Sequence, residues 1–225
     1  MNAHPQPAEK KEPLDLAEKG GNAKLDRRLF VQLLAFGGCK DPMKLKRPNT
    51  VVYEELNDPL GAAVVAWSES PDELMEGRRE LRELGLTFKP EYAMLGRTYS
   101  LGYEPNLEDW LIHRTPRVLL DAAAKWAVWY PLRRTGAFSQ LAKPEQQQIL
   151  REHGIIGRAF GDAGLASDVR LACTGLDKND NDFVIGLLGK ELFPLSALVE
   201  AMRPTKQTSQ YIAHMGPFFV GRRVA

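Results

Sequence analysis

The order of secondary-structure signals between residues 125 and 224 constrains the fold most. Apolar runs of strand length alternate with two stretches of helical period, and an Asp- and Asn-rich turn joins the two middle strands. The first strand is expected to stop at Pro131. The six elements are predicted at residues 125–132, 143–161, 167–175, 181–188, 191–203 and 216–224. This βαββαβ order is typical of the ferredoxin-like unit.

The first half of the chain supplies most of the same elements. Its strands are expected at residues 27–38, 61–69 and 91–103. A helix begins after Ser70, has Pro71 at its first position and closes at Gly85. Residues 39–60 and 104–118 are interpreted as loops, so the first crossover of this half is degraded. We therefore predict an α+β protein whose two ferredoxin-like halves form a dimeric α/β-barrel-like pair.

Three segments follow from this pattern. Residues 1–24 form a polar tail that is too poor in apolar residues to fold. Residues 25–118 form the degraded N-terminal half, and residues 119–225 form the C-terminal half. The tail lacks the apolar region of a secretory signal, and no apolar run has the length of a bilayer span. A cytoplasmic protein without membrane contact is expected.

Charge and cysteine content exclude several classes of function. Thirty basic and 29 acidic side chains give a net charge of +1, whereas nucleic-acid binding normally requires a basic excess or stripe. Cys39 and Cys173 lie far apart in the chain and outside any CxxC motif. They are interpreted as buried free thiols, not as a disulfide framework or a zinc site.

One histidine falls on the apolar face of a predicted helix. Ile149, His153, Ile156 and Phe160 are spaced i, i+4, i+7 and i+11, which places them on one side of a helix of period 3.6. Taken alone, such a histidine is more often a hydrogen-bonded core residue than a ligand.

Five short motifs give this histidine a second interpretation. They read YPLRR (130–134), REHGIIGRAF (151–160), TGLDKNDNDFVIGL (174–187), MRPTKQTSQY (202–211) and GPFFVG (216–221). In this order they resemble the chlorite dismutase-like family, haem proteins of paired ferredoxin-like halves that include chlorite dismutases and coproheme decarboxylases. The resemblance implies that His153 is the proximal ligand of the iron and that the cofactor is haem b or iron-coproporphyrin III.

Four further positions bear on the reaction and the cofactor. Tyr130 and Arg134 resemble the Y-P-M-x-K segment of the decarboxylases, in which the tyrosine passes the oxidising equivalent to a porphyrin propionate and the basic residue positions it. A strand tyrosine can equally fill a core. Leu188 stands where chlorite dismutases carry a glutamate that hydrogen-bonds the proximal imidazole, and a leucine cannot do this. Ser209 matches a serine that holds a propionate.

Arg170 favours the chlorite dismutase branch. There a distal arginine, on the strand before the TGLD segment, retains the chlorine oxyanion near the iron. Counting back from Gly175 places the family's distal position at Asp168, whereas counting forward from His153 places it at Ala166. The alternative for Arg170 is a surface side chain paired with Asp168.

The preferred hypothesis is a haem-dependent oxidoreductase resembling peroxide-dependent coproheme decarboxylase, an enzyme of haem biosynthesis. The first alternative is a chlorite dismutase or a weak haem b peroxidase, and the second is a non-catalytic haem carrier or sensor. The resemblance implies small-molecule substrates (hydrogen peroxide with coproheme, or chlorite) and a homo-oligomer, often a pentamer.

Overall fold

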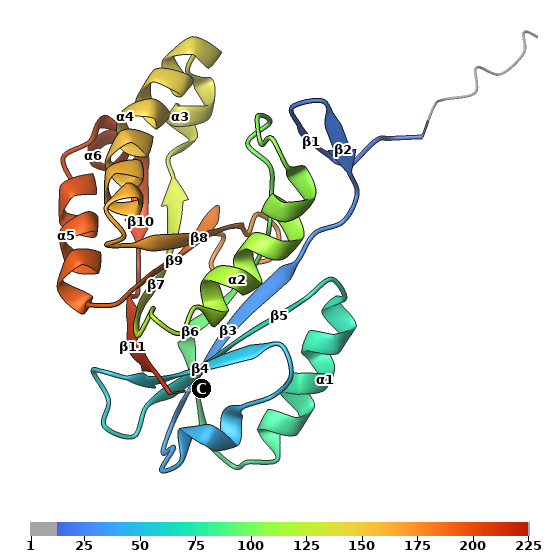
Figure 1. The fold of residues 1–225 in the computed structure, drawn as a ribbon, viewed down its shortest axis with the longest axis vertical. Helices are drawn as coiled ribbons and strands as arrows, with labels where there is room; N and C mark the ends of the chain where they lie inside the picture. Colours follow the sequence, from blue (N-terminus) through green and yellow to red (C-terminus); the bar gives the residue numbers. More distant parts are fainter. Residues whose placement is uncertain (1–12, 225) are drawn as a thin grey trace, which may run out of the picture.

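The computed structural model describes residues 13–224 and has a closed β-barrel at its centre (Figure 1). The strands follow the order β10-β7-β11-β4-β5-β3-β6-β8-β9, and an additional pairing of β7 with β9 closes the ring. Their bounds are β3 (Phe30–Gly37), β4 (Thr50–Glu55), β5 (Ala62–Ser68), β6 (Thr87–Arg97), β7 (Trp126–Arg134), β8 (Ser167–Ala172), β9 (Phe183–Gly189), β10 (Ile212–Met215) and β11 (Phe219–Arg223). Strands β10 and β11 are successive partners of β7.

Two ferredoxin-like halves share this barrel. The first has the strand order β4-β5-β3-β6 and the second the equivalent order β11-β7-β9-β8. One seam between them joins β11 to β4, and the other joins β6 to β8 through the pair Arg97↔Ala172. The predicted fold class is thereby confirmed. The division of the chain at residues 118 and 119 stays a prediction.

Helices cover the outside of the barrel (Figure 1). Helix α1 (Pro71–Arg82) lies beside the first half, and α3 (Gly136–Gln140), α4 (Lys143–Asp162), α5 (Leu192–Met202) and α6 (Lys206–Tyr211) lie beside the second. A π-helical turn, η2 (Asp109–His113), runs into α2 (Arg114–Leu120), which precedes β7. None of the helices described between residues 13 and 224 is long and apolar enough to cross a membrane.

Strand alternation divides the core of the second half into two faces. On β7, Ala127 and Trp129 belong to the cluster inside the barrel, whereas Val128 and Tyr130 belong to the outer cluster beneath the helices. Ile156 and Phe160 of α4 pack against that outer cluster, as the helical period predicted. Cys39 and Cys173 are buried free thiols, as expected.

Two predicted loops contain regular elements. Residues 39–60 hold a 3-10 turn, η1 (Pro42–Leu45), and strand β4, and residues 104–118 hold η2 and most of α2. These elements are short, so neither shows a full period in the sequence. Strand β7 also continues beyond Pro131 to Arg134. Proline is tolerated there because its missing N–H falls where the partner of β7 changes from β11 to β10, and its carbonyl accepts a hydrogen bond from Gly216 N at 2.9 Å.

The predicted tail is partly ordered. A small antiparallel hairpin pairs β1 (Glu18–Gly20) with β2 (Ala23–Leu25), so the prediction of disorder is wrong for this part of residues 1–24. Polar contacts with a loop of the barrel hold the hairpin, together with the packing of Leu25 against the inner cluster, and composition does not indicate contacts between such distant segments. The first twelve residues lie outside the described residues.

Candidate functional site

His153 projects from the middle of α4, and its side chain is partly buried. Its Nδ1 atom is buried and has no hydrogen-bond partner among the described residues. Burial and the positive charges of Arg134 and Arg170 together lower the pKa of His153 to about 4, although the nearby Glu152 opposes them. The imidazole is therefore neutral at physiological pH, and a ring nitrogen has a lone pair that it could donate to a metal ion.

Arg134 stands at the end of β7, in a pocket of aromatic rings. Its backbone N–H donates to Asp182 Oδ2 at 2.7 Å, which fixes the strand end. The guanidinium carbon lies 4.6 Å from the centroids of both Phe138 and Phe183. Burial lowers the pKa of Arg134, and its Nε atom has no partner among the described residues. The side chain is a desolvated cation held between two rings.

Arg170 and Asp168 occupy the outer face of β8, because the alternate residues Val169 and Leu171 face the inside of the barrel. Arg170 Nε lies 2.5 Å from Asp168 Oδ2, and Arg114 of α2 donates to Asp168 Oδ1 at 2.7 Å and to its carbonyl oxygen at 2.8 Å. Burial alone would raise the pKa of Asp168, but the two arginines outweigh burial and lower it. The carboxylate thus holds two guanidinium groups at once.

Two aromatic residues that the sequence did not indicate, Tyr99 and Trp110, also lie beside these arginines. Together with Phe138 and Phe183 they form what we call the aromatic wall. The ring of Trp110 lies 4.8 Å from the guanidinium of Arg114 and 5.5 Å from that of Arg170, and its Nε1 donates to Tyr99 O at 2.9 Å. The Tyr99 ring lies 5.7 Å from that of Phe183. Burial raises the pKa of Tyr99, and the charges of Arg170 and Arg134 oppose this rise. Trp110 falls in a predicted loop, so no periodic signal marked it.

Tyr130 lies on the same outer face of β7 as Arg134. Its ring stacks on Phe218 with centroids 4.7 Å apart and an interplanar angle of 26°. The side chain is buried, which raises the pKa of its phenol, and the negative charge of Asp168 acts in the same direction. The phenol is therefore fully protonated, and both interpretations of Tyr130, core filler and redox residue, agree with its position.

Two sequence-based assignments do not join this group. Leu188 belongs to the cluster inside the barrel, on the opposite face of β9 from Leu187, which packs beneath the helices. The argument that Leu188 replaces a carboxylate beside His153 is therefore wrong. Ser209 is exposed, and its hydroxyl donates to the carbonyl oxygen of Thr205, the residue that caps the start of α6, at 2.9 Å. Its contact with a propionate stays a prediction.

Two cavities are lined by none of these residues. One of about 420 Å³ is lined by α2 residues and Ser167, and one of about 260 Å³ lies between α1 and the sheet of the first half. His153 lines neither of them. Within residues 13–224, no three His, Cys, Asp or Glu side chains come together to hold a metal ion. What the structure brings together is one neutral imidazole, a set of arginines and a wall of aromatic rings.

Comparisons with known proteins identify the family of this fold. A family model described as chlorite dismutase matches residues 57–224. Among solved structures, the candidate chlorite dismutase TA0507 has a TM-score of 0.72 at 12% identity over 88% of this chain and 96% of its own. A haem-binding protein from Thermus thermophilus gives 0.68 at 17% identity over 89% and 92%. The imidazole complex of chlorite dismutase from Candidatus Nitrospira defluvii gives 0.62 at 14% identity over 89% and 92%. Because the family model covers most of the chain, the protein belongs to the chlorite dismutase family.

Proposed function

We propose that this protein binds an iron porphyrin through His153 and oxidises it as the coproheme decarboxylases do. The observation that carries the proposal is the convergence of a neutral, partly buried imidazole with the cations Arg134 and Arg170. An imidazole is a common axial ligand of haem iron, and the macrocycle supplies the equatorial ligands, so no cluster of protein ligands is required. The haem-binding relative from Thermus thermophilus supports the same cofactor class.

The charges around His153 suit a porphyrin with propionate side chains. Arginine binds carboxylates through charge-assisted hydrogen bonds, and Arg134 has an Nε without a partner among the described residues, beside the aromatic wall. Phe183 and Phe138 exclude water around that cation, which strengthens its attraction for an anion. We assign to Arg134 the role of positioning one propionate.

The bound iron would activate hydrogen peroxide, which accepts the two electrons released when a propionate becomes a vinyl group. The conversion balances as one propionate, one hydrogen peroxide and one proton giving one vinyl group, one carbon dioxide and two waters. Tyr130 is the redox residue of this proposal. Its phenol is protonated and shielded from solvent, so it can give up an electron and its Oη proton together and recover both from the substrate.

Chlorite decomposition is the second candidate, and Arg170 is its support. A cation that retains a chlorine oxyanion should be free to contact it, but Arg170 is already paired with Asp168, which also binds Arg114. That pairing reduces the attraction of Arg170 for a second anion. The decarboxylase is therefore the function that we favour.

Two measurements test these proposals. Titration of the purified protein with ferric coproporphyrin III should shift and sharpen the Soret band of the free porphyrin, and His153→Ala should lose this change. A wild-type protein that leaves the Soret band of the free porphyrin unchanged would refute the binding of porphyrin. Bound haem without turnover of peroxide or chlorite would instead indicate the non-catalytic carrier or sensor.

The reaction is tested by adding hydrogen peroxide to the coproheme complex and following the porphyrin by mass spectrometry. Tyr130→Phe should bind coproheme normally but lose decarboxylation by at least about 100-fold, because phenylalanine has no phenolic proton to release. Tyr103→Phe is the matched control, since Tyr103 is 73% exposed. Unchanged turnover in Tyr130→Phe would refute the assigned role. Oxygen release from chlorite that collapses in Arg170→Ala would favour the second candidate.

A further inference from the structure

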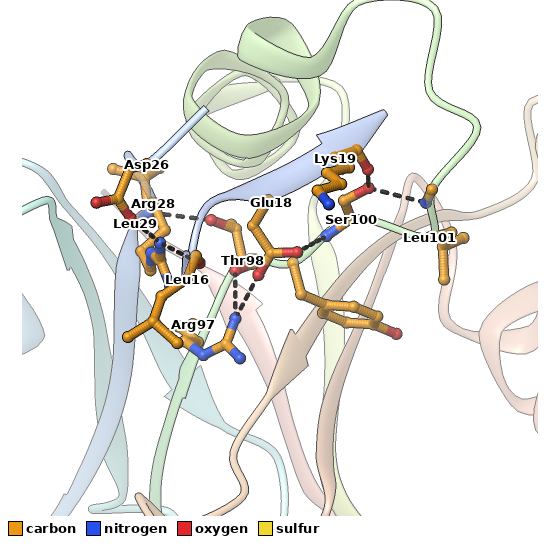
Figure 2. A network of polar contacts seen from close by, with 12 residues as sticks. Leu16, Glu18, Lys19, Asp26, Arg28, Leu29, Arg97, Thr98, Ser100 and Leu101 are labelled. Atoms are coloured by element: carbon orange, nitrogen blue, oxygen red, sulfur yellow. Dashed lines mark hydrogen bonds and ion pairs between the residues drawn. The ribbon is translucent and has the colours of Figure 1, made fainter. Parts of the chain in front are cut away.

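Polar contacts join strand β1 of the N-terminal hairpin to the segment that follows β6 (Figure 2). The Glu18 carboxylate of β1 accepts a hydrogen bond from Arg97 Nη1 at 2.8 Å and another from Ser100 N at 3.1 Å. The Ser100 hydroxyl contacts Lys19 O, and Gly20 forms a parallel bridge with Gly102. All of these contacts reach the segment 97–104, which begins at the end of β6.

The attached loop also has internal hydrogen bonds that fix its shape. Glu104 is 4% exposed, and its carboxylate accepts hydrogen bonds from Leu101 N at 2.6 Å, from the Ser100 hydroxyl at 2.7 Å and from Gly102 N at 3.1 Å. These bonds lower the pKa of Glu104 although burial opposes them. A Cβ atom added to Gly20 would lie 2.9 Å from Leu107 Cδ1 and 3.2 Å from Glu104 O, so the hairpin packs closely on the loop.

The same loop carries Tyr99 into the His153 site. The Tyr99 ring packs on Phe183, which in turn contacts Arg134, and the Tyr99 carbonyl accepts the indole N–H of Trp110. Trp110 lies beneath Arg170. The contacts with Glu18 therefore precede Tyr99 at Arg97 and follow it at Ser100, so the hairpin holds the loop on both sides of the tyrosine.

We infer that the hairpin β1–β2 is a strap that positions Tyr99 and Trp110 against the site, and that Glu18 is its positioning residue. The inference rests on the proposed function only where it concerns porphyrin retention. Loss of the strap would let the Tyr99 ring leave Phe183 and would open the aromatic wall beside Arg134 to water. A bound porphyrin would then dissociate faster, since water would compete for its propionates.

Two variants of Glu18 and one control separate this role from a general loss of stability. Glu18→Ala removes both hydrogen bonds, and Glu18→Gln keeps an acceptor for Ser100 N. Lys24→Ala is the matched control. Lys24 Nζ forms an ion pair with Asp15 Oδ2 at 2.5 Å, and this pair lies within the N-terminal segment and does not involve the loop. Circular dichroism should show the same folded signal for all three, since the hairpin lies outside the barrel.

The first readout uses the protein without porphyrin. The chain has four tryptophans, and the indole N–H signal of Trp110 can be assigned in an NMR spectrum by its loss in Trp110→Phe. Glu18→Ala should shift this signal and speed its hydrogen exchange roughly tenfold, as expected when a hydrogen bond to a charged group stops holding the loop. Glu18→Gln should restore part of the effect, and Lys24→Ala should show none. A Trp110 signal unchanged in Glu18→Ala would overturn the strap.

The second readout is the rate at which ferric porphyrin leaves the loaded protein for an excess of apomyoglobin. Glu18→Ala should release it roughly tenfold faster, in proportion to the faster exchange at Trp110. An altered Trp110 signal with an unchanged release rate would overturn the link between the strap and the site. A wild-type protein that takes up no porphyrin would refute the proposed function instead, and the NMR measurement would still decide whether the strap exists.

Discussion

The neutral state of His153 predicts how the free energy of unfolding of the porphyrin-free protein changes with pH. Burial and two arginines lower its pKa from 6.5 to about 4. Between these values the unfolded chain binds a proton that the folded chain excludes, so the free energy of unfolding is highest above pH 6.5 and falls as the pH falls. Integration gives a loss of about 2 kcal/mol between pH 7 and pH 5, and about 3 kcal/mol once the pH is below 4.

Urea unfolding at pH 7 and pH 5 measures this loss directly. The wild type should lose about 2 kcal/mol more than His153→Gln over this interval, since the glutamine has no proton to exclude. His113→Gln is the matched control, because His113 is exposed on η2. If the wild type and His153→Gln lose equal stability between the two pH values, the imidazole is not held neutral by its surroundings and the reasoning is wrong.

Two further predictions concern packing and charge. Gly186→Ala places a Cβ atom 2.6 Å from the Trp129 ring, which is 1% exposed and cannot move aside, so thermal unfolding should show a destabilisation of about 2–3 kcal/mol; a loss below about 0.5 kcal/mol would contradict the packing described here. Asp168→Ala leaves the guanidinium groups of Arg114 and Arg170 without the carboxylate between them, which should cost about 2–3 kcal/mol in urea unfolding. Added acetate should restore part of this loss and chloride should restore less, whereas equal effects of the two salts would exclude a specific anion site.

The sequence predicted the second half of the fold because its elements are long and periodic. The apolar stripe of α4 placed His153, Ile156 and Phe160 on one face of that helix, and the structure packs Ile156 and Phe160 against the outer cluster of the second half. Short elements were missed: β4 has six residues and α2 has seven, too few for a period to emerge from the surrounding polar chain.

Contacts between distant segments could not be predicted from local pattern. Tyr99 and Trp110 reach the site because β6 meets β8 at the seam of the barrel, and no local feature encodes that meeting. The error at Leu188 has a different origin. Neighbouring strand residues point to opposite faces, so a shift of one position moved that side chain from the helix-covered face to the barrel interior.

The two seams of the barrel differ in a way that bears on its motions. Strand β11 pairs with β4 at three positions, whereas β6 pairs with β8 at one. Local unfolding occurs most readily where few hydrogen bonds hold two segments together. We therefore expect the barrel to open transiently between β6 and β8 while the pairing of β11 with β4 is kept. That weaker junction is the single pair of Arg97 with Ala172, on the same strand as Arg170. The half of the molecule that bears the proposed porphyrin site is therefore joined firmly to the other half at β11–β4 and only weakly at β6–β8.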